Sequence, residues 1–174
     1  AGIWMGGTVR EGQAYYDGNV RAEWERLERH PFEFLVTMEM LGRTIHPGDR
    51  VLDIGEGPGR YSLALAKRGC KVTLLDLSSG NVAFALEEAA RQGVTLEALC
   101  GDAREADRLV TARDFDHVLL MGPLYHLLDE AERERAVRAA LAPLKPGGLL
   151  YASFILMFSG MIYMMRECPD LVLG

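Results

Sequence analysis

The stretch Val51-Leu-Asp-Ile-Gly-Glu-Gly-Pro-Gly-Arg60 decides the fold of this chain. A short apolar run that ends in Asp53 predicts a buried strand, and residues 61–69 predict a helix. Between them stand three alternate glycines, Gly55, Gly57 and Gly59. Glycine permits a positive φ and a close approach of the backbone, and a helix that begins here directs free N–H groups into the turn. The pattern therefore predicts a ligand-binding loop, and the alternative is a tight turn without a ligand.

The residues between the glycines indicate which ligand the loop would accept. A dinucleotide loop has the spacing G-x-G-x-x-G, whereas Arg60 stands here at the place of the third glycine. The carboxylate of Glu56 would repel a pyrophosphate, and Pro58 removes one N–H donor. Asp53 and Glu56 suit a ligand with positive charge, such as an ammonium or a sulfonium group. The loop thus favours S-adenosylmethionine over NAD.

Composition is that of one globular domain. The chain has 174 residues, of which 49% are apolar and 25% charged, and its net charge of −6 argues against a nucleic-acid partner. Three widely spaced cysteines, with no C-x-x-C pair, predict reduced thiols in a cytoplasmic protein and no metal site. The apolar stretch 149–165 is shorter than the roughly 20 residues of a membrane-spanning helix, so no membrane partner is expected.

Strand and helix patterns alternate after the glycine loop. Further strands are predicted at residues 71–76, 94–100, 114–122 and 149–155, with helices at 80–92, 103–113 and 129–141. The segment 144–148, Leu-Lys-Pro-Gly-Gly, predicts a turn into the last strand. Five strands separated by helices predict an α/β fold, a doubly wound and mostly parallel sheet with the order 3-2-1-4-5.

Residues 1–44 are predicted to form a helical arm in front of the α/β domain, which would span residues 45–174. Helices are expected at 20–30 and 32–43, with Leu35, Met38 and Leu41 of the second helix packed on the sheet. Tyr15 and Tyr16 are predicted to anchor the arm to the surface. The alternative, a lid over the cofactor, is what the family resemblance described next implies.

The segment 53–59 resembles the D/E-x-G-x-G first motif of the class I S-adenosylmethionine-dependent methyltransferases. Phe115-Asp116, Gly122-Pro-Leu-Tyr-His-Leu127 and Lys145-Pro-Gly-Gly148 follow in the order of that family, so the resemblance covers roughly residues 45–156. It implies a Rossmann-like methyltransferase fold, S-adenosyl-L-methionine as cofactor, and methyl transfer to a small-molecule acceptor. The family fold also adds a final β-hairpin, and the chain ends before it at Gly174, so we expect a sheet without that hairpin or truncated before it.

Acidic residues at two further strand ends complete the predicted cofactor site. Asp76 follows the loop by about 20 residues, the distance at which a carboxylate binds a ribose diol, and the alternative is that it caps a helix. The resemblance implies the same role for Asp76, with Leu77 beside it, and places an adenine-binding acid at Asp102, which otherwise begins a turn. The predicted cofactor-binding residues are Asp53, Gly55, Glu56, Gly57, Gly59, Asp76, Leu77, Gly101, Asp102, Ala103, Met121, Gly122 and Tyr16.

The catalytic candidates follow the fourth strand. The methyl group of a sulfonium is already activated, so alignment alone provides much of the rate, and a poor nucleophile also needs a base. His126 is predicted as that base, unless it caps a short helix, and Tyr125 is predicted to position the acceptor. His117, inside the strand, is expected to be a buried core histidine. The alternatives are an NAD(P)-dependent oxidoreductase and a module that binds S-adenosylmethionine without transferring its methyl group. The sequence predicts neither the acceptor atom nor the oligomeric state.

Overall fold

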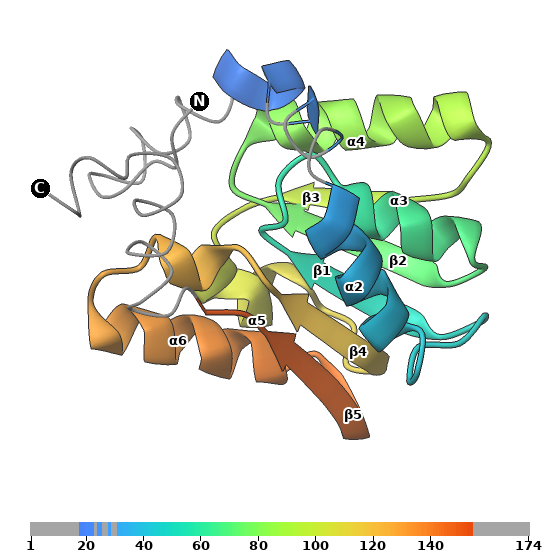
Figure 1. The fold of residues 1–174 in the computed structure, drawn as a ribbon. Helices are drawn as coiled ribbons and strands as arrows, with labels where there is room; N and C mark the ends of the chain where they lie inside the picture. The colour runs from blue at the N-terminus through green and yellow to red at the C-terminus, as the bar shows by residue number, and fades with distance from the viewer. Residues whose placement is uncertain (1–17, 23, 26–27, 29–30, 155–174) are drawn as a thin grey trace, which may run out of the picture.

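The computed structural model describes residues 18–22, 24–25, 28 and 31–154. It consists of a five-stranded parallel sheet with the order β3-β2-β1-β4-β5, with helices on both faces (Figure 1). The elements are α2 (Pro31–Leu41), β1 (Arg50–Ile54), α3 (Arg60–Lys67), β2 (Lys71–Asp76), α4 (Ser79–Gln92), β3 (Glu97–Cys100), η1 (Ala103–Glu105), α5 (Ala106–Leu109), β4 (Phe115–Leu120), η2 (Pro123–Tyr125), α6 (Glu130–Leu141) and β5 (Leu144–Ala152). The predicted fold class and strand order are confirmed.

Two hydrophobic cores hold the three layers together. The first joins one face of the sheet to α2, α3 and α4, through residues such as Met38, Leu63 and Ala85. The second joins the opposite face to α5 and α6, through Ala106 and Ala139. A parallel sheet covered on both faces requires apolar residues at nearly every position of its central strands. This requirement explains why β1 and β2 are short continuous apolar runs, and why their bounds agree with the prediction.

The helices of the sheet's first face carry the expected end signals. Ser78 caps α4, because its side chain accepts a hydrogen bond from the N–H of Asn81, and Gly93 ends the helix with a φ of 68°. Pro31 is the first residue of α2, where a missing N–H costs nothing. Met38 of that helix is buried, but Leu35 is 61% exposed, so the prediction that Leu35 packs on the sheet is wrong.

Three predicted elements differ in their extent. The third strand begins at Glu97, not at residue 94, and the predicted helix 103–113 is two short turns, η1 and α5. The segment 144–148 is not a separate turn but the irregular beginning of β5. Leu144 pairs with Phe115, and the register then shifts before His117 pairs with Leu149, so the extra residues bulge out of the sheet.

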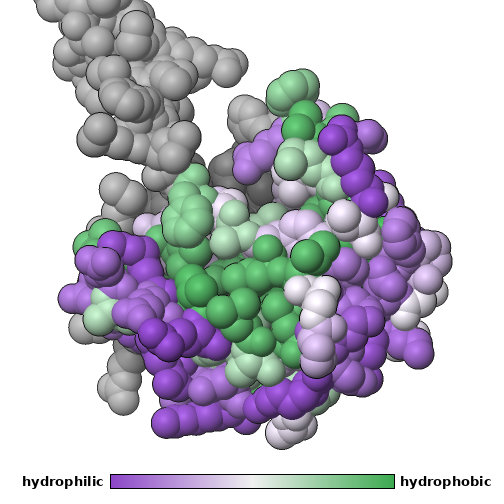
Figure 2. All heavy atoms as spheres, turned by 90° about the horizontal axis from the view of Figure 1, so that it is seen from below, coloured by the Kyte–Doolittle hydropathy of each residue, from purple (hydrophilic) through white to green (hydrophobic). Residues whose placement is uncertain are grey.

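β5 is the edge strand of the described sheet and exposes apolar side chains. Leu149 is 44% exposed, and Phe154, which follows the strand, is 61% exposed. Figure 2 views the molecule from the side on which β5 and α6 lie, and it shows an apolar area framed by hydrophilic residues. Residues after 154, where the prediction placed the end of the domain, lie outside the described residues. Among the described residues, no helix is long and apolar enough to cross a membrane.

Candidate functional site

The loop between β1 and α3 has the conformation that its glycines predict. Gly55, Gly57 and Gly59 have φ angles of 69°, 85° and 83°, which place all three in the left-handed region. A Cβ atom at Gly55 would lie 2.3 Å from Cγ of Pro123, and one at Gly59 would lie 3.0 Å from Cβ of Ala85. At Gly57 the nearest atom would be 3.8 Å away. The first and third glycines thus permit close packing, whereas the middle glycine borders open space.

Asp53, the last acid of β1, is completely buried under this loop. Its Oδ2 accepts a hydrogen bond of 2.7 Å from the hydroxyl of Ser62 on α3, while its Oδ1 is buried without any partner. Burial raises the pKa of Asp53 to about 7, the hydrogen bond from Ser62 lowers it, and the nearby charge of Asp76 raises it further. A carboxylate in this position requires a hydrogen-bond donor that the described residues do not supply.

Glu56, inside the loop, is the second carboxylate with an unpartnered oxygen. Its Oε2 is buried without a partner. Burial raises the pKa of Glu56 well above its ordinary value and the neighbouring Asp53 adds to this effect, while the backbone N–H groups of Tyr61 and Arg60, in the first turn of α3, act in the opposite direction. The side chain therefore places a carboxyl group beside a helix N-terminus, where it disfavours an external anion.

Asp76, at the end of β2, fastens the glycine loop to the next strand and helix. Its Oδ2 accepts the N–H of Gly57 at 2.9 Å. Its Oδ1 accepts the N–H of Ser78 at 2.9 Å and the side-chain amide of Asn81 at 3.0 Å. Asp76 is only 5% exposed, and Leu77 beside it is half-buried. The structure thus gives Asp76 a definite role in holding the loop.

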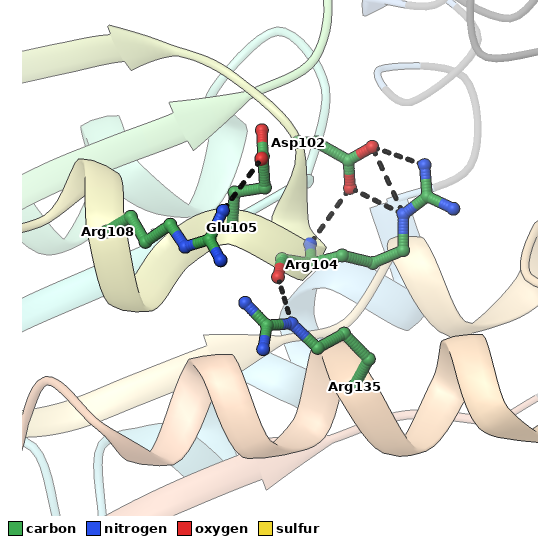
Figure 3. A pocket seen from close by; sticks show the side chains of 5 residues that line it. All are labelled: Asp102, Arg104, Glu105, Arg108 and Arg135. Atoms are coloured by element: carbon green, nitrogen blue, oxygen red, sulfur yellow. Dashed lines mark hydrogen bonds and ion pairs between the residues drawn. The ribbon is translucent and has the colours of Figure 1, made fainter.

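Asp102, after β3, is held by Arg104 (Figure 3). Its Oδ1 accepts the backbone N–H of Arg104 at 2.9 Å, so it caps η1, and its Oδ2 lies 2.6 Å from Nη2 of the same arginine. Burial alone would raise the pKa of Asp102, but the hydrogen bonds from Arg104 outweigh it and hold the pKa below its usual range. Asp102 thus begins this turn, and its contact with adenine stays a prediction. Ala103 is the first residue of η1, and a Cβ atom on Gly101 would lie 2.2 Å from Cδ1 of Leu109.

A hollow of about 460 Å³ lies beside Asp102, on η1, α5 and α6 and not at the glycine loop. Its other lining residues are Arg104, Glu105, Arg108 and Arg135 (Figure 3). Each of these guanidinium groups is within 4 Å of a carboxylate, so the hollow carries little uncompensated charge. Although it is the larger of the two hollows described in this section, it does not contain the unpartnered carboxylates.

The segment after β4 contacts the glycine loop directly. A Cβ atom on Gly122 would lie 1.9 Å from the carbonyl oxygen of Gly55, so the two backbones touch. Met121, which precedes Gly122, accepts a hydrogen bond of 2.7 Å at its carbonyl from the hydroxyl of Ser153. The Tyr125 hydroxyl donates in turn to Ser153 Oγ. This chain of contacts joins the end of β4, η2 and the end of β5.

Tyr125 and His126 lie side by side at the end of η2. Burial raises the pKa of Tyr125, so its phenol keeps its proton at neutral pH and serves as a hydrogen-bond donor. His126 is half-buried at the C-cap of η2, where its backbone N–H donates to the carbonyl of Pro123 at 3.0 Å. A second hollow, of about 250 Å³, is lined by Leu124, Tyr125, Leu127, Leu128, Arg133 and Phe154.

Comparison with known proteins adds an independent observation to this geometry. Residues 51–148 match the family profile described as "Methyltransferase domain". The chain belongs to this methyltransferase-domain family. The matched range begins in β1 and ends in β5, so it contains every strand and the whole glycine loop. The predicted resemblance is confirmed.

Relatives of this methyltransferase domain include longer proteins. The chain is 36% identical over 113 residues to the "Ubiquinone biosynthesis O-methyltransferase" of Methylocella silvestris, covering 61% of this chain and 40% of that protein. It is 32% identical over 130 residues to the protein of the same name from Aeromonas salmonicida, covering 70% of this chain and 53% of that one. A crystal structure of a SAM-dependent methyltransferase from Methanosarcina mazei is 29% identical with a TM-score of 0.60, covering 77% of this chain and 66% of that one. The chain thus spans about half the length of the relatives named O-methyltransferase.

The methyltransferase domain brings some predicted residues together and separates another. Asp53, Glu56 and Asp76 are close enough to influence one another electrostatically. His117 lies elsewhere in β4: it is 6% exposed, with Nε2 3.2 Å from Asp49 and Nδ1 3.3 Å from the Tyr151 hydroxyl, which confirms it as a buried core histidine. Tyr16 lies outside the described residues.

Sequence reasoning missed three polar residues that support the site. Ser62 holds Asp53, Asn81 holds Asp76, and Ser153 joins Tyr125 to Met121. Ser62 and Asn81 are buried, although each is a polar residue within a helix. Both Ser62 and Asn81 are polar residues in the first turn of a helix, and each helix follows a strand with an acid near its end. This pattern is the signal that would have found them.

Proposed function

We propose that this chain is the cofactor-binding domain of an S-adenosylmethionine-dependent methyltransferase that acts on a small-molecule acceptor. The observation that carries the proposal is the pair of buried, unpartnered carboxylate oxygens, Oδ1 of Asp53 and Oε2 of Glu56, at one glycine loop. A buried carboxylate without a donor is costly, and a cationic ligand removes that cost. S-adenosylmethionine carries both an ammonium and a sulfonium group. Membership of the methyltransferase-domain family supports the same ligand.

The residues of the site fit the parts of this cofactor. Asp53 and Glu56 match its ammonium and sulfonium groups, and Gly57 leaves space beside the loop for a ligand to approach the backbone. Asp76 is our candidate for the ribose hydroxyls, and it also holds the loop through Gly57. The remaining proposed contacts fall into four groups. Leu77, Gly101, Asp102 and Ala103 lie on the adenine side, and Met121 and Gly122 lie at the end of β4. Gly55 and Gly59 belong to the loop, and Tyr16 belongs to the proposed lid of residues 1–44.

The bound cofactor supplies a methyl group that is activated by a positively charged sulfur. The chain's own residues then have to hold the acceptor and move one proton. Tyr125, whose phenolic proton is donated to Ser153, orients the acceptor by accepting a hydrogen bond at its phenolic oxygen. His126, directly next to it, is our candidate for the base that receives the acceptor's proton at an imidazole nitrogen. Fixed orientation of the reactants lowers the activation barrier of such reactions by roughly 7–11 kcal/mol, so the base adds to a rate that positioning already provides.

We further propose an oxygen nucleophile on a small, partly apolar acceptor. The names of the Methylocella and Aeromonas relatives support the acceptor atom. The hollow of about 250 Å³ beside Tyr125 supports the size and the character of the acceptor, because four of its lining side chains are leucine or phenylalanine. The small number and wide spacing of the cysteines support a cytoplasmic location.

Calorimetric titration with S-adenosylmethionine, S-adenosylhomocysteine and NADH tests the cofactor. We expect both adenosyl ligands to bind and NADH not to bind, since the carboxyl groups of Asp53 and Glu56 at the loop would repel a pyrophosphate. Asp53→Asn should weaken the binding of S-adenosylhomocysteine, whereas Glu134→Gln, at an exposed ion pair on α6, should leave it unchanged. Transfer of a labelled methyl group to a panel of phenols and alcohols then separates an enzyme from a binding module. Binding of NADH in place of the adenosyl ligands would refute the proposal.

A further inference from the structure

The second hollow, beside Tyr125, combines one cationic side chain with a mostly apolar wall. The hollow has a volume of about 250 Å³, and the cationic side chain is that of Arg133, which is half-buried near the start of α6. The remaining lining residues are Leu124, Leu127, Leu128 and Phe154. The attraction between opposite charges is stronger beside such apolar side chains than in open water. The guanidinium group therefore favours an anionic ligand in this hollow.

The guanidinium group of Arg133 is fixed in place and still has donors to offer. Its Nη1 donates to the carbonyl oxygen of Leu127 at 2.8 Å and to that of Leu128 at 2.7 Å. These two bonds use the hydrogens of Nη1, whereas a guanidinium group has five N–H donors in a rigid plane. Among the described residues, no acceptor binds the donors on Nε and Nη2. One edge of the group is thus oriented by the protein and available to a ligand.

The acidic neighbours of Arg133 on α6 do not neutralise it, because they pair with other arginines. Glu132 accepts a hydrogen bond from Arg104, and Glu134 lies 2.6 Å from Nη2 of Arg138. Within the part of the chain that the structure describes, Arg133 has no carboxylate within 4 Å. The positive charge in the second hollow is therefore left for an external anion.

The first hollow provides a contrast within the same molecule (Figure 3). It is also lined by arginines, but Arg104, Arg108 and Arg135 each pair with a carboxylate of this chain. An anion that enters it has to compete with those carboxylates. An anion that enters the second hollow meets Arg133 without such competition.

We propose that Arg133 is a specificity-determining residue that binds a carboxylate group of the methyl acceptor. The Nε–Nη2 edge of a guanidinium group matches the two oxygens of a carboxylate through parallel hydrogen bonds. A cavity of about 150 Å³ accepts benzene, so the hollow of about 250 Å³ has room for a substituted ring. The acceptor is thus a hydroxy acid with an apolar body, whose hydroxyl group meets Tyr125 and whose carboxylate meets Arg133. The inference rests on the proposed function only in naming this acid as the acceptor.

The two backbone bonds also give Arg133 a structural role, which the test has to separate from the binding of an anion. These bonds tie residues 127 and 128 to α6. If Arg133 only held this segment, its loss would weaken every ligand of the hollow to the same extent. If Arg133 binds the carboxylate, its loss weakens a charged ligand and spares a neutral ligand of the same shape.

Calorimetric titration with matched ligands makes this comparison. Dihydroxybenzoate and the dihydroxybenzamide with the same hydroxyl positions would be titrated near neutral pH with S-adenosylhomocysteine present. The wild-type chain should bind the acid roughly tenfold more tightly than the amide, as expected for hydrogen bonds between charged groups. High salt should reduce this difference. Caffeate and its amide, which have a longer body, repeat the comparison.

Three variants test whether the preference depends on Arg133. Arg133→Gln should weaken the acid roughly tenfold and leave the amide unchanged. Arg133→Lys keeps the charge but loses the planar pair of donors, so its preference for the acid should be intermediate. Arg138→Gln removes an exposed ion pair on the same helix and should change neither affinity.

The outcomes distinguish this inference from the proposed function. If neither acid binds to the wild-type chain more tightly than its amide, the inference is overturned. It is also overturned if Arg133→Gln weakens acid and amide equally, since Arg133 then merely holds the segment before α6. If the acid binds through Arg133 but no methyl group is transferred, the proposed function fails and the carboxylate site stands. If the Arg133 variants do not fold, the comparison of acid and amide on the wild-type chain decides the question.

Discussion

Asp53→Asn should change how the stability of the ligand-free protein depends on pH. The substitution keeps the shape of the side chain and an oxygen that accepts the Ser62 hydroxyl, but it removes the charge that burial disfavours. Burial raises the pKa of Asp53 from 3.8 to about 7. The folded protein therefore holds this proton more tightly than the unfolded chain does. The resulting stability is fully present below about pH 4 and is lost as the pH rises through 7.

The size of the effect follows from the pKa shift. One pKa unit corresponds to about 1.4 kcal/mol, so a shift of roughly three units is worth about 4 kcal/mol in total. About 2 to 3 kcal/mol of this falls between pH 5 and pH 8. Over that interval the wild-type chain should lose this much more of its free energy of unfolding than Asp53→Asn loses. Titrating groups away from the site act equally in both proteins and cancel in the comparison, whereas the pKa of Glu56 falls in the variant because Asp53 no longer raises it.

Urea unfolding followed by circular dichroism at several pH values measures the difference. Glu134→Gln is the matched control, because it removes an exposed carboxylate, and its curve should run parallel to that of the wild type. Saturating S-adenosylhomocysteine should reduce the difference between wild type and Asp53→Asn, since its ammonium group compensates the buried charge. If the free energies of unfolding of the wild type and of Asp53→Asn changed in parallel with pH in the absence of ligand, Asp53 would not be desolvated. The electrostatic argument for the site would then fail.

Three further substitutions test the remaining parts of the site. Gly122→Ala places a Cβ atom 1.9 Å from the carbonyl oxygen of Gly55, so it should destabilise the fold by about 1–3 kcal/mol; an unchanged melting temperature would contradict this contact. Asp76→Ala should weaken the binding of S-adenosylhomocysteine by at least about 1.5 kcal/mol in calorimetry, through lost hydrogen bonds to ligand and loop, and an unchanged Kd would remove Asp76 from the site. His126→Ala should lower the rate of methyl transfer by a factor of about 100 and abolish the acidic limb of the rate's pH profile. Tyr125→Phe should lower the rate about fivefold and leave the pH profile unchanged. The opposite pattern would assign the base to Tyr125.

The central sheet could be predicted from the sequence because its signals are local. Strands β1 and β2 are largely apolar runs with an aspartate next to or at their end, and the glycines after β1 match the positive φ angles of the loop. The predicted order of five parallel strands followed from connection rules that hold for alternating strands and helices. Elements at the edge were predicted less well. The bulge at the start of β5 depends on pairing with Phe115, which lies about 30 residues earlier in the chain.

The contacts of the site's carboxylates could not be predicted, because they depend on residues brought together by the fold. The sequence indicated that Asp76 and Asp102 stand at strand ends, but not that Gly57 and Arg104 bind them. The unpartnered oxygen of Glu56 is likewise invisible in the sequence. It results from the position of a side chain that lies against the first turn of α3. Such burial is a property of the folded packing alone.

The direct contact between Gly55 and the segment that begins at Gly122 has a consequence for the evolution of this protein. A Cβ on Gly122 would meet the carbonyl oxygen of Gly55, and one on Gly55 would meet the ring of Pro123, so neither position accepts a larger residue without a shift of the main chain. If the proposed function is correct, replacement of the residues that line the neighbouring hollow would alter which acceptor fits, while this contact keeps the spacing between the loop and the segment constant.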